Sequence, residues 1–155
     1  TDTMKKLLIL TALLCGPLCS FGQDDGFRKL FEKYAGREGY TTVEMSGEMF
    51  RAINEVGSSD FHFHNVNRLF IIVTEEEKEA NEAFAREVKQ LLDREGYTPV
   101  SVVRDGEEYV EFFALTADGK TTELVMNARE GNGEHIVLLL SGSDLRIEQI
   151  LRMTR

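Results

Sequence analysis

The chain has 155 residues, is 42% hydrophobic and carries a formal net charge of −9 at pH 7. This length fits one domain of ordinary size. Nucleic acid and anionic lipid are disfavoured as partners, because binding to phosphate requires clustered lysine and arginine.

The N-terminal segment has the three parts of a secretory signal peptide. Two lysines precede the uncharged run 7–15, and a short small-residue exit follows. The run is shorter than the roughly 20 apolar residues that cross a bilayer, so no transmembrane helix is expected. Ser20 and Gly22 suit cleavage before Gln23. We therefore expect residues 1–22 to be a leader and cleaved signal peptide, and the mature protein to be periplasmic or secreted.

A lipid anchor is the alternative form of export. A lipoprotein signal needs a small residue directly before the acylated cysteine, but leucines precede Cys15 and Cys19. Soluble export is therefore favoured over an outer-membrane lipoprotein, although Cys19-Ser20 with polar residues after it leaves that form open. Because both cysteines lie in this segment, residues 23–155 have no disulfide, thiolate nucleophile or cysteine-based metal site.

The first part of the mature chain alternates helix and strand signals. Apolar residues at helical spacing predict a helix over 25–37, and β-branched and aromatic residues predict a strand over 40–45. Ser46 can cap a short helix that ends at Gly57. The continuous apolar run 69–73 predicts a strand buried on both faces. The short helix is expected to bury Met49, Phe50 and Ile53.

The clearest helix signal follows this strand. Thr74 and Glu77 form a capping-box pattern at its start, and Gly96 ends it. Its expected apolar stripe consists of Ala80, Ala83, Phe84, Val88, Leu91 and Leu92.

After Gly96 the apolar pattern changes from helical spacing to alternation. Strands are predicted over 97–104, 107–115, 120–129 and 134–141, with Asp-Gly or Gly-Asn-Gly turns between them. Consecutive hairpins of this kind form a four-stranded antiparallel meander. Ser143 or Asp144 can cap a final helix, which is expected to bury Leu145, Ile147, Ile150 and Leu151.

The element order α-β-α-β-α-β-β-β-β-α predicts one globular α+β domain over 23–155, with helices packed on one face of a mostly antiparallel sheet. The apolar strands 69–73 and 136–140 should lie inside the sheet. The more polar strands 40–45 and 97–104 should be its edges, and Pro99 in the second of them fits an edge. An edge can accept an added strand from a partner, and this is the docking mode that we expect.

The segment Asp60-Phe-His-Phe-His64 is the cluster to consider for a metal. In an extended chain Asp60, His62 and His64 point to one side, and two imidazoles with a carboxylate can bind zinc. His135 is the remaining imidazole, and no ligand-bearing helix of the His-Glu-x-x-His type is present. A loop whose phenylalanines cover the core edge is the favoured reading, because such short pairs are common by chance. No metal ligand is therefore assigned.

Catalytic motifs are also missing. The sequence has no Gly-x-Ser-x-Gly turn. Glu107, Glu108 and Glu111 could suggest paired carboxylates, but solvated charges on a hairpin edge explain them. The Gly131-Asn-Gly133 loop leads into a strand, whereas a phosphate-binding loop leads into a helix. No catalytic or cofactor-binding residue is assigned, no cofactor is expected, and an enzyme is not favoured.

Four stretches carry a family resemblance. They are Phe27-Arg-Lys-Leu-Phe-Glu-Lys-Tyr34, Gly39-Tyr-Thr-Thr-Val-Glu-Met-Ser46 with Met49-Phe50, Leu69–Thr74, and Ile136-Val-Leu-Leu-Leu-Ser-Gly142 with Asp144, Leu145 and Ile150. Together they resemble a family of exported Bacteroidetes-type bacterial proteins, defined by a domain of unknown function numbered 4252. Each stretch is a core pattern, so the resemblance implies an exported small domain of unassigned activity and supplies no site residues.

Export, acidic charge and the missing catalytic motifs favour a non-catalytic binding or assembly module of the bacterial envelope. Its partner would be a protein or a glycan of the envelope. The alternative is a metal-dependent hydrolase that uses the pair His62 and His64.

Overall fold

The computed structural model describes residues 25–56, 65–75 and 78–148. Their elements are, in chain order, α2 (Asp25–Tyr34), β1 (Tyr40–Ser46), α3 (Gly47–Val56), β2 (Val66–Thr74), α4 (Lys78–Glu95), β3 (Thr98–Asp105), β4 (Glu108–Ala117), β5 (Lys120–Arg129) and β6 (His135–Gly142).

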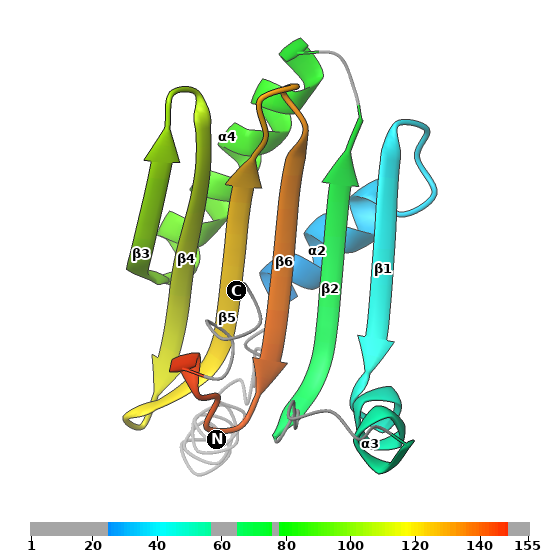
Figure 1. The fold of residues 1–155 in the computed structure, drawn as a ribbon, viewed down its shortest axis with the longest axis vertical. Helices are drawn as coiled ribbons and strands as arrows, with labels where there is room; N and C mark the ends of the chain where they lie inside the picture. The colour runs from blue at the N-terminus through cyan, green and yellow to red at the C-terminus, as the bar shows by residue number, and fades with distance from the viewer. Residues whose placement is uncertain (1–24, 57–64, 76–77, 149–155) are drawn as a thin grey trace, which may run out of the picture.

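The described strands form one sheet of six, in the order β1-β2-β6-β5-β4-β3 (Figure 1), and each neighbouring pair is antiparallel. The predicted α+β class is confirmed, and β3 to β6 form the expected C-terminal meander. The apolar strands β2 and β6 lie inside the sheet, and β1 and β3 are its edges, also as expected. For these four strands the apolar content therefore correctly separates inner strands from edges, because inner strands are covered more completely.

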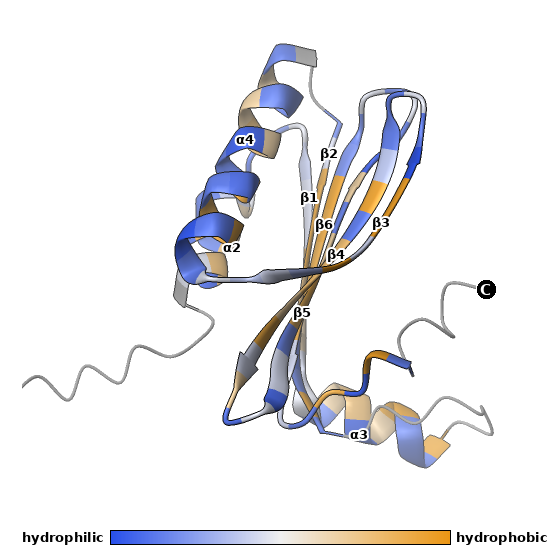
Figure 2. Ribbon diagram, turned by 90° about the vertical axis from the view of Figure 1, so that its left-hand side faces the viewer, coloured by the Kyte–Doolittle hydropathy of each residue, from blue (hydrophilic) through white to orange (hydrophobic). Residues whose placement is uncertain are grey.

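The helices α2 and α4 cover one face of the sheet (Figure 2). Leu30 of α2 and Val88 of α4 pack with Ile72 and Leu139 in one core cluster, and none of the four is more than 4% exposed. Two positions of α4 differ from the expected stripe. Ala83 is exposed, whereas Asn81 is buried.

A hydrogen bond explains why Asn81 is buried. The side-chain amide of Asn81 donates to the carbonyl of Gly133 at 2.9 Å, which links the start of α4 to the turn between β5 and β6. The first turn of α4 therefore faces this turn with a polar side chain. An apolar stripe alone cannot reveal such a contact.

The helix α3 is an exception to the single-face arrangement. It lies at one end of the sheet (Figure 2), and its Phe50 joins a second cluster with Leu124 and Leu140 on the opposite face. Met49 and Ile53, which were expected to be buried, are 53% and 36% exposed. The expectation is wrong for these two residues because a helix at the end of a sheet has little surface to pack against.

The turn between β4 and β5 shows why the hairpin signals are reliable. Asp118 and Gly119 both have positive φ, 53° and 74°. A type I′ turn requires positive φ at its two central residues, and Asp-Gly adopts it at low cost. Ala117 and Lys120 are partners in the ladder on either side of this turn.

The chain after β6 returns onto the face opposite α2 and α4. Leu145 is 6% exposed and belongs to the second cluster, and Ile147 packs against it. The expected final helix begins at Ile147, while Ile150 and Leu151 lie outside the described residues. So do the signal segment, the cap residue Glu77 and the cluster at 60–64.

The helices in the described ranges are not candidates for membrane spans. None of them combines the length and the apolar character that a bilayer crossing requires.

Candidate functional site

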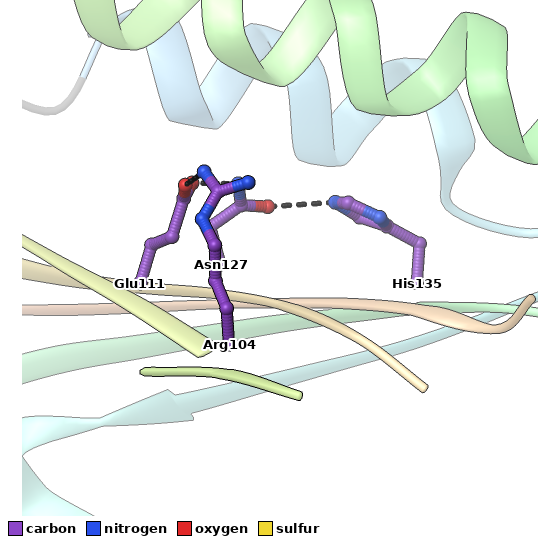
Figure 3. A network of polar contacts seen from close by, with 4 residues as sticks. All are labelled: Arg104, Glu111, Asn127 and His135. Carbon is purple, nitrogen blue, oxygen red and sulfur yellow. Dashed lines mark hydrogen bonds and ion pairs between the residues drawn. The ribbon is translucent and has the colours of Figure 1, made fainter. Parts of the chain in front are cut away.

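A polar network lies between the sheet and the helices α2 and α4 (Figure 3). The guanidinium of Arg104 donates to Glu111 Oε1 at 3.0 Å, and Asn127 Nδ2 donates to Glu111 Oε2 at 3.2 Å. His135 Nε2 lies 2.6 Å from Asn127 Oδ1. Because the amide nitrogen of Asn127 serves Glu111, its oxygen must accept from His135, which assigns the imidazole proton to Nε2.

His135 is held on all sides by the core. Its side chain is 1% exposed, its ring makes edge contacts with Phe84 and Tyr109, and its backbone N–H donates to Thr74 Oγ1 at 3.2 Å. Burial, with a smaller effect from the charge of Arg129, lowers the pKa of His135 to about 4. The imidazole is therefore neutral at neutral pH, and its Nε2 is engaged by Asn127.

The cavity that borders His135 is too small for a substrate. A cavity of about 10 Å³ borders His135, Asn81 and Arg129. This volume is close to the minimum that one water needs, whereas ligand pockets usually measure about 300–1,000 Å³. His135 and Asn127 are therefore buried members of the core, and the cavity at His135 has room for about one water.

Sequence reasoning misjudged one member of this network. Glu111 was expected to be a solvated edge charge together with Glu107 and Glu108. Only the latter two are exposed, and the Glu111 side chain is 17% exposed. Position 111 points to the helix-covered face while position 108 points away from it, and alternation along the strand could have separated them. No sequence signal identified Asn127 as the link to His135.

The opposite face of the sheet is apolar in three successive rows that cross the strands. The inner row is Met45, Leu69, Leu140, Leu124 and Ala114, each paired with the next. The middle row is Val43, Ile71, Leu138, Met126 and Phe112. The outer row is Val73, Ile136, Ala128, Val110 and Val103.

These three rows differ in what covers them. Phe50 of α3 and the returning residues Leu145 and Ile147 pack on the inner row. Of the described side chains in the middle and outer rows, only Leu138 packs against one of the two core clusters. At the two edges of the sheet, Val43 is 39% and Val103 is 61% exposed. Between these edges the side chains of both rows are partly exposed, except Ala128, which is buried. We call the middle and outer rows the open face.

The open face has uncharged ends and an acidic margin. Ser101 ends the middle row and Thr41 ends the outer row, so neither row contains a charged side chain. Beyond the outer row, on the same side of the strands, come Asp105, Glu108 and Glu130. They line an open pocket of about 350 Å³ together with Val103, Val110 and Ala128.

No group of three or more histidine, cysteine, aspartate or glutamate residues is arranged to hold a metal within 25–56, 65–75 and 78–148. Asp60, His62 and His64 lie outside these ranges. Of the residues considered as metal ligands, the structure describes only His135, which is buried in the core and contacts Asn127.

Comparison with known proteins gives one family. The model of a domain of unknown function, DUF4252, matches residues 34–153 and so takes in the sheet, α3 and α4. No curated protein and no solved structure matches the chain.

Proposed function

We propose that this chain, which belongs to the DUF4252 family of domains of unknown function, is a non-catalytic binding module of the bacterial cell envelope. The observation that carries the proposal is the open face. Two rows of large apolar side chains cross the sheet next to a third row that the chain itself covers. Apart from the buried Ala128, the side chains of these rows are at least partly exposed, and contiguous apolar surface marks sites of interaction.

The chemistry of the open face favours a protein over a glycan. Its side chains are almost entirely hydrocarbon, with Phe112 the aromatic member of the middle row. Hydroxyl groups of a sugar placed there would lose water without gaining hydrogen bonds, at a cost of roughly 1–3 kcal/mol each. Apolar side chains of a protein partner would pay no such cost.

The envelope location rests on the leader segment. A periplasmic or secreted protein is the expected product of the basic, apolar and small-residue parts of residues 1–22. A lipid anchor at Cys15 or Cys19 remains the less favoured form of the same proposal.

A pull-down from envelope extract with two matched variants tests the proposal. Val103 and Val102 are neighbours on β3, 61% and 48% exposed, and point to opposite faces of the sheet. Val103→Lys places a charge on the open face, and Val102→Lys makes the same change on the other side. We expect wild type and Val102→Lys to recover the same protein and Val103→Lys to lose it. Equal recovery by both variants, or no recovered protein, would contradict the proposal.

A further inference from the structure

We infer that the open face holds one amphipathic helix of the partner protein, with lysine or arginine residues of that helix opposite Asp105, Glu108 and Glu130. This inference rests on the proposed binding function and specifies its partner. Three features of the described residues support it: the dimensions of the open face, the distribution of charge around it, and the net charge of the chain.

The dimensions of the open face match one helix. Neighbouring strands lie about 4.8 Å apart, so a row that crosses six strands is about 24 Å long. Two rows take up about 13 Å along the strands, at two residues a row. A helix with its side chains is about 10–12 Å across, and about 16 residues span 24 Å. A larger globular partner would need roughly 800 Å² on each side, more than these two rows provide.

Acidic side chains gather at one corner of this face. The middle and outer rows are uncharged, and the acidic side chains of Asp105, Glu108 and Glu130 come directly after the outer row at the corner formed by β3, β4 and β5. Arg129 also lines the pocket at this corner, but the register pairs it with His135 on the helix-covered face. A helix that lays its apolar stripe on the rows therefore meets carboxylates along one side, where basic residues are favoured.

The same charges argue against two other occupants. A second copy of the chain would bring its own acidic margin and a net charge of −9 to the interface. An anionic lipid surface would be repelled by the same margin. A basic amphipathic helix is the occupant that satisfies both the apolar rows and the carboxylates.

Two synthetic peptides serve as probes. One consists of about 18 leucine and lysine residues at amphipathic helical spacing, about 27 Å long as a helix, and the other has glutamate in place of every lysine. Their Kd values for the full mature protein are measured by titration calorimetry. We expect the lysine peptide to bind at least about tenfold more tightly than the glutamate peptide, a difference of about 1.4 kcal/mol.

The matched valine variants locate the binding. Val103→Lys is expected to raise the Kd of the lysine peptide at least about tenfold, because the new charge would be buried under the apolar stripe of the peptide. Val102→Lys adds the same charge and should change Kd by less than about twofold, because position 102 faces the other way. Equal losses would mean that the peptide binds by net charge alone and would overturn the inference.

Reversal of the acidic margin supplies an independent readout. In the double variant Glu108→Lys with Glu130→Lys, we expect the preference for the lysine peptide to shrink or reverse. An unchanged preference would contradict the assigned charges, and so would a wild type that binds neither peptide.

Three outcomes would identify another occupant and overturn the inference. A wild-type dimer that Val103→Lys dissociates in sedimentation would identify a second copy of the chain. Phosphatidylglycerol vesicles that bind wild type but not Val103→Lys would identify a lipid surface. Tighter peptide binding after deletion of residues 149–155 would identify the chain's own C-terminal segment. A pull-down that still depends on Val103 while the peptides fail would leave the binding function intact and refute only the helix.

Discussion

At the scale of single residues, three polar side chains beneath the helices are positioned by their hydrogen bonds to one another. Glu111, Asn127 and His135 form a chain in which each donor finds an acceptor, and Arg104 closes it at the edge of the sheet. An unpaired polar group in the same place would cost roughly 1–3 kcal/mol. The network therefore restricts the arrangement of the core.

The depressed pKa of His135, about 4, predicts a loss of stability in acid. In the unfolded chain this imidazole has a pKa near 6.5. Between pH 6.5 and pH 4 the unfolded state therefore binds a proton that the folded state does not bind. The stabilisation is complete above pH 6.5 and decreases as the pH falls toward 4, by up to about 3 kcal/mol. His135→Gln keeps a donor for Asn127 but cannot titrate. Its free energy of unfolding should therefore fall less steeply between pH 7 and pH 4.5, as measured by urea denaturation, and equal slopes would refute the effect.

Removal of the Asn127 side chain should also lower the stability of the protein. Asn127→Ala leaves Glu111 and His135 each without one partner, and should cost about 2 kcal/mol or more in the free energy of unfolding. Asn67→Ala, at an exposed position of β2, is the matched control and should change stability by less than about 0.5 kcal/mol. Similar losses in the two variants would show that the network contributes little.

At the scale of elements, the helices differ in how firmly they join the sheet. The long helix α4 buries Phe84, Val88, Leu91 and Leu92 in the first cluster. The short helix α3 buries Phe50 and leaves Val56 89% exposed. Stability should therefore depend strongly on the contacts of α4 and weakly on the exposed residues of α3.

A pair of valine truncations measures this difference. Val88 is fully buried, so Val88→Ala should destabilise the protein by about 2 kcal/mol through lost contacts and a cavity. Val56→Ala makes the same change on an exposed helical position and should have an effect below about 0.5 kcal/mol. Thermal or urea unfolding checks both, and a large cost at Val56 would indicate that α3 is packed more tightly than described.

The edge strands offer a different docking mode from the open face. Strand addition would bring new backbone hydrogen bonds to β1 or β3. A helix on the open face would touch side chains while the strand amides keep their present partners. For a bound complex, we therefore expect hydrogen exchange at the outer amides of β1 and β3 to stay unchanged. New protection along either edge would instead support strand addition, which the edge positions alone predict.

At the scale of the whole molecule, residues 23–155 must be stable without a disulfide. Residues 23–155 contain no cysteine, and two clusters on opposite faces of the sheet supply the core. We expect one cooperative unfolding transition with the same midpoint in the presence and absence of reductant and EDTA. A midpoint that falls markedly with EDTA would support the metal-dependent hydrolase. Asp60, His62 and His64 would then be the residues to mutate.

The export prediction also belongs to this scale. Protein purified from its native host should have the mass of a chain that begins at Gln23. A lipid-modified N-terminus at Cys15 or Cys19 would replace soluble export by anchoring, and an uncleaved N-terminus would contradict both forms.

The sequence by itself determined the fold class, the order of the elements along the chain, and which strands lie inside the sheet and which at its edges. Periodicity separates helices from strands, Asp118-Gly119 specifies its turn locally, and the apolar content of β2 and β6 distinguishes inner strands from edges. These properties depend on residues near one another in the chain, so a local pattern is enough to predict them.

Only the tertiary structure decided which apolar residues form the core and which form a surface. Met49 and Ile53 have the spacing of a buried stripe, but α3 lies at the end of the sheet and leaves them exposed. The rows of the open face, and the link from Glu111 through Asn127 to His135, join residues from strands far apart in sequence. Strand register brings them together, and register depends on how the whole sheet packs against its helices.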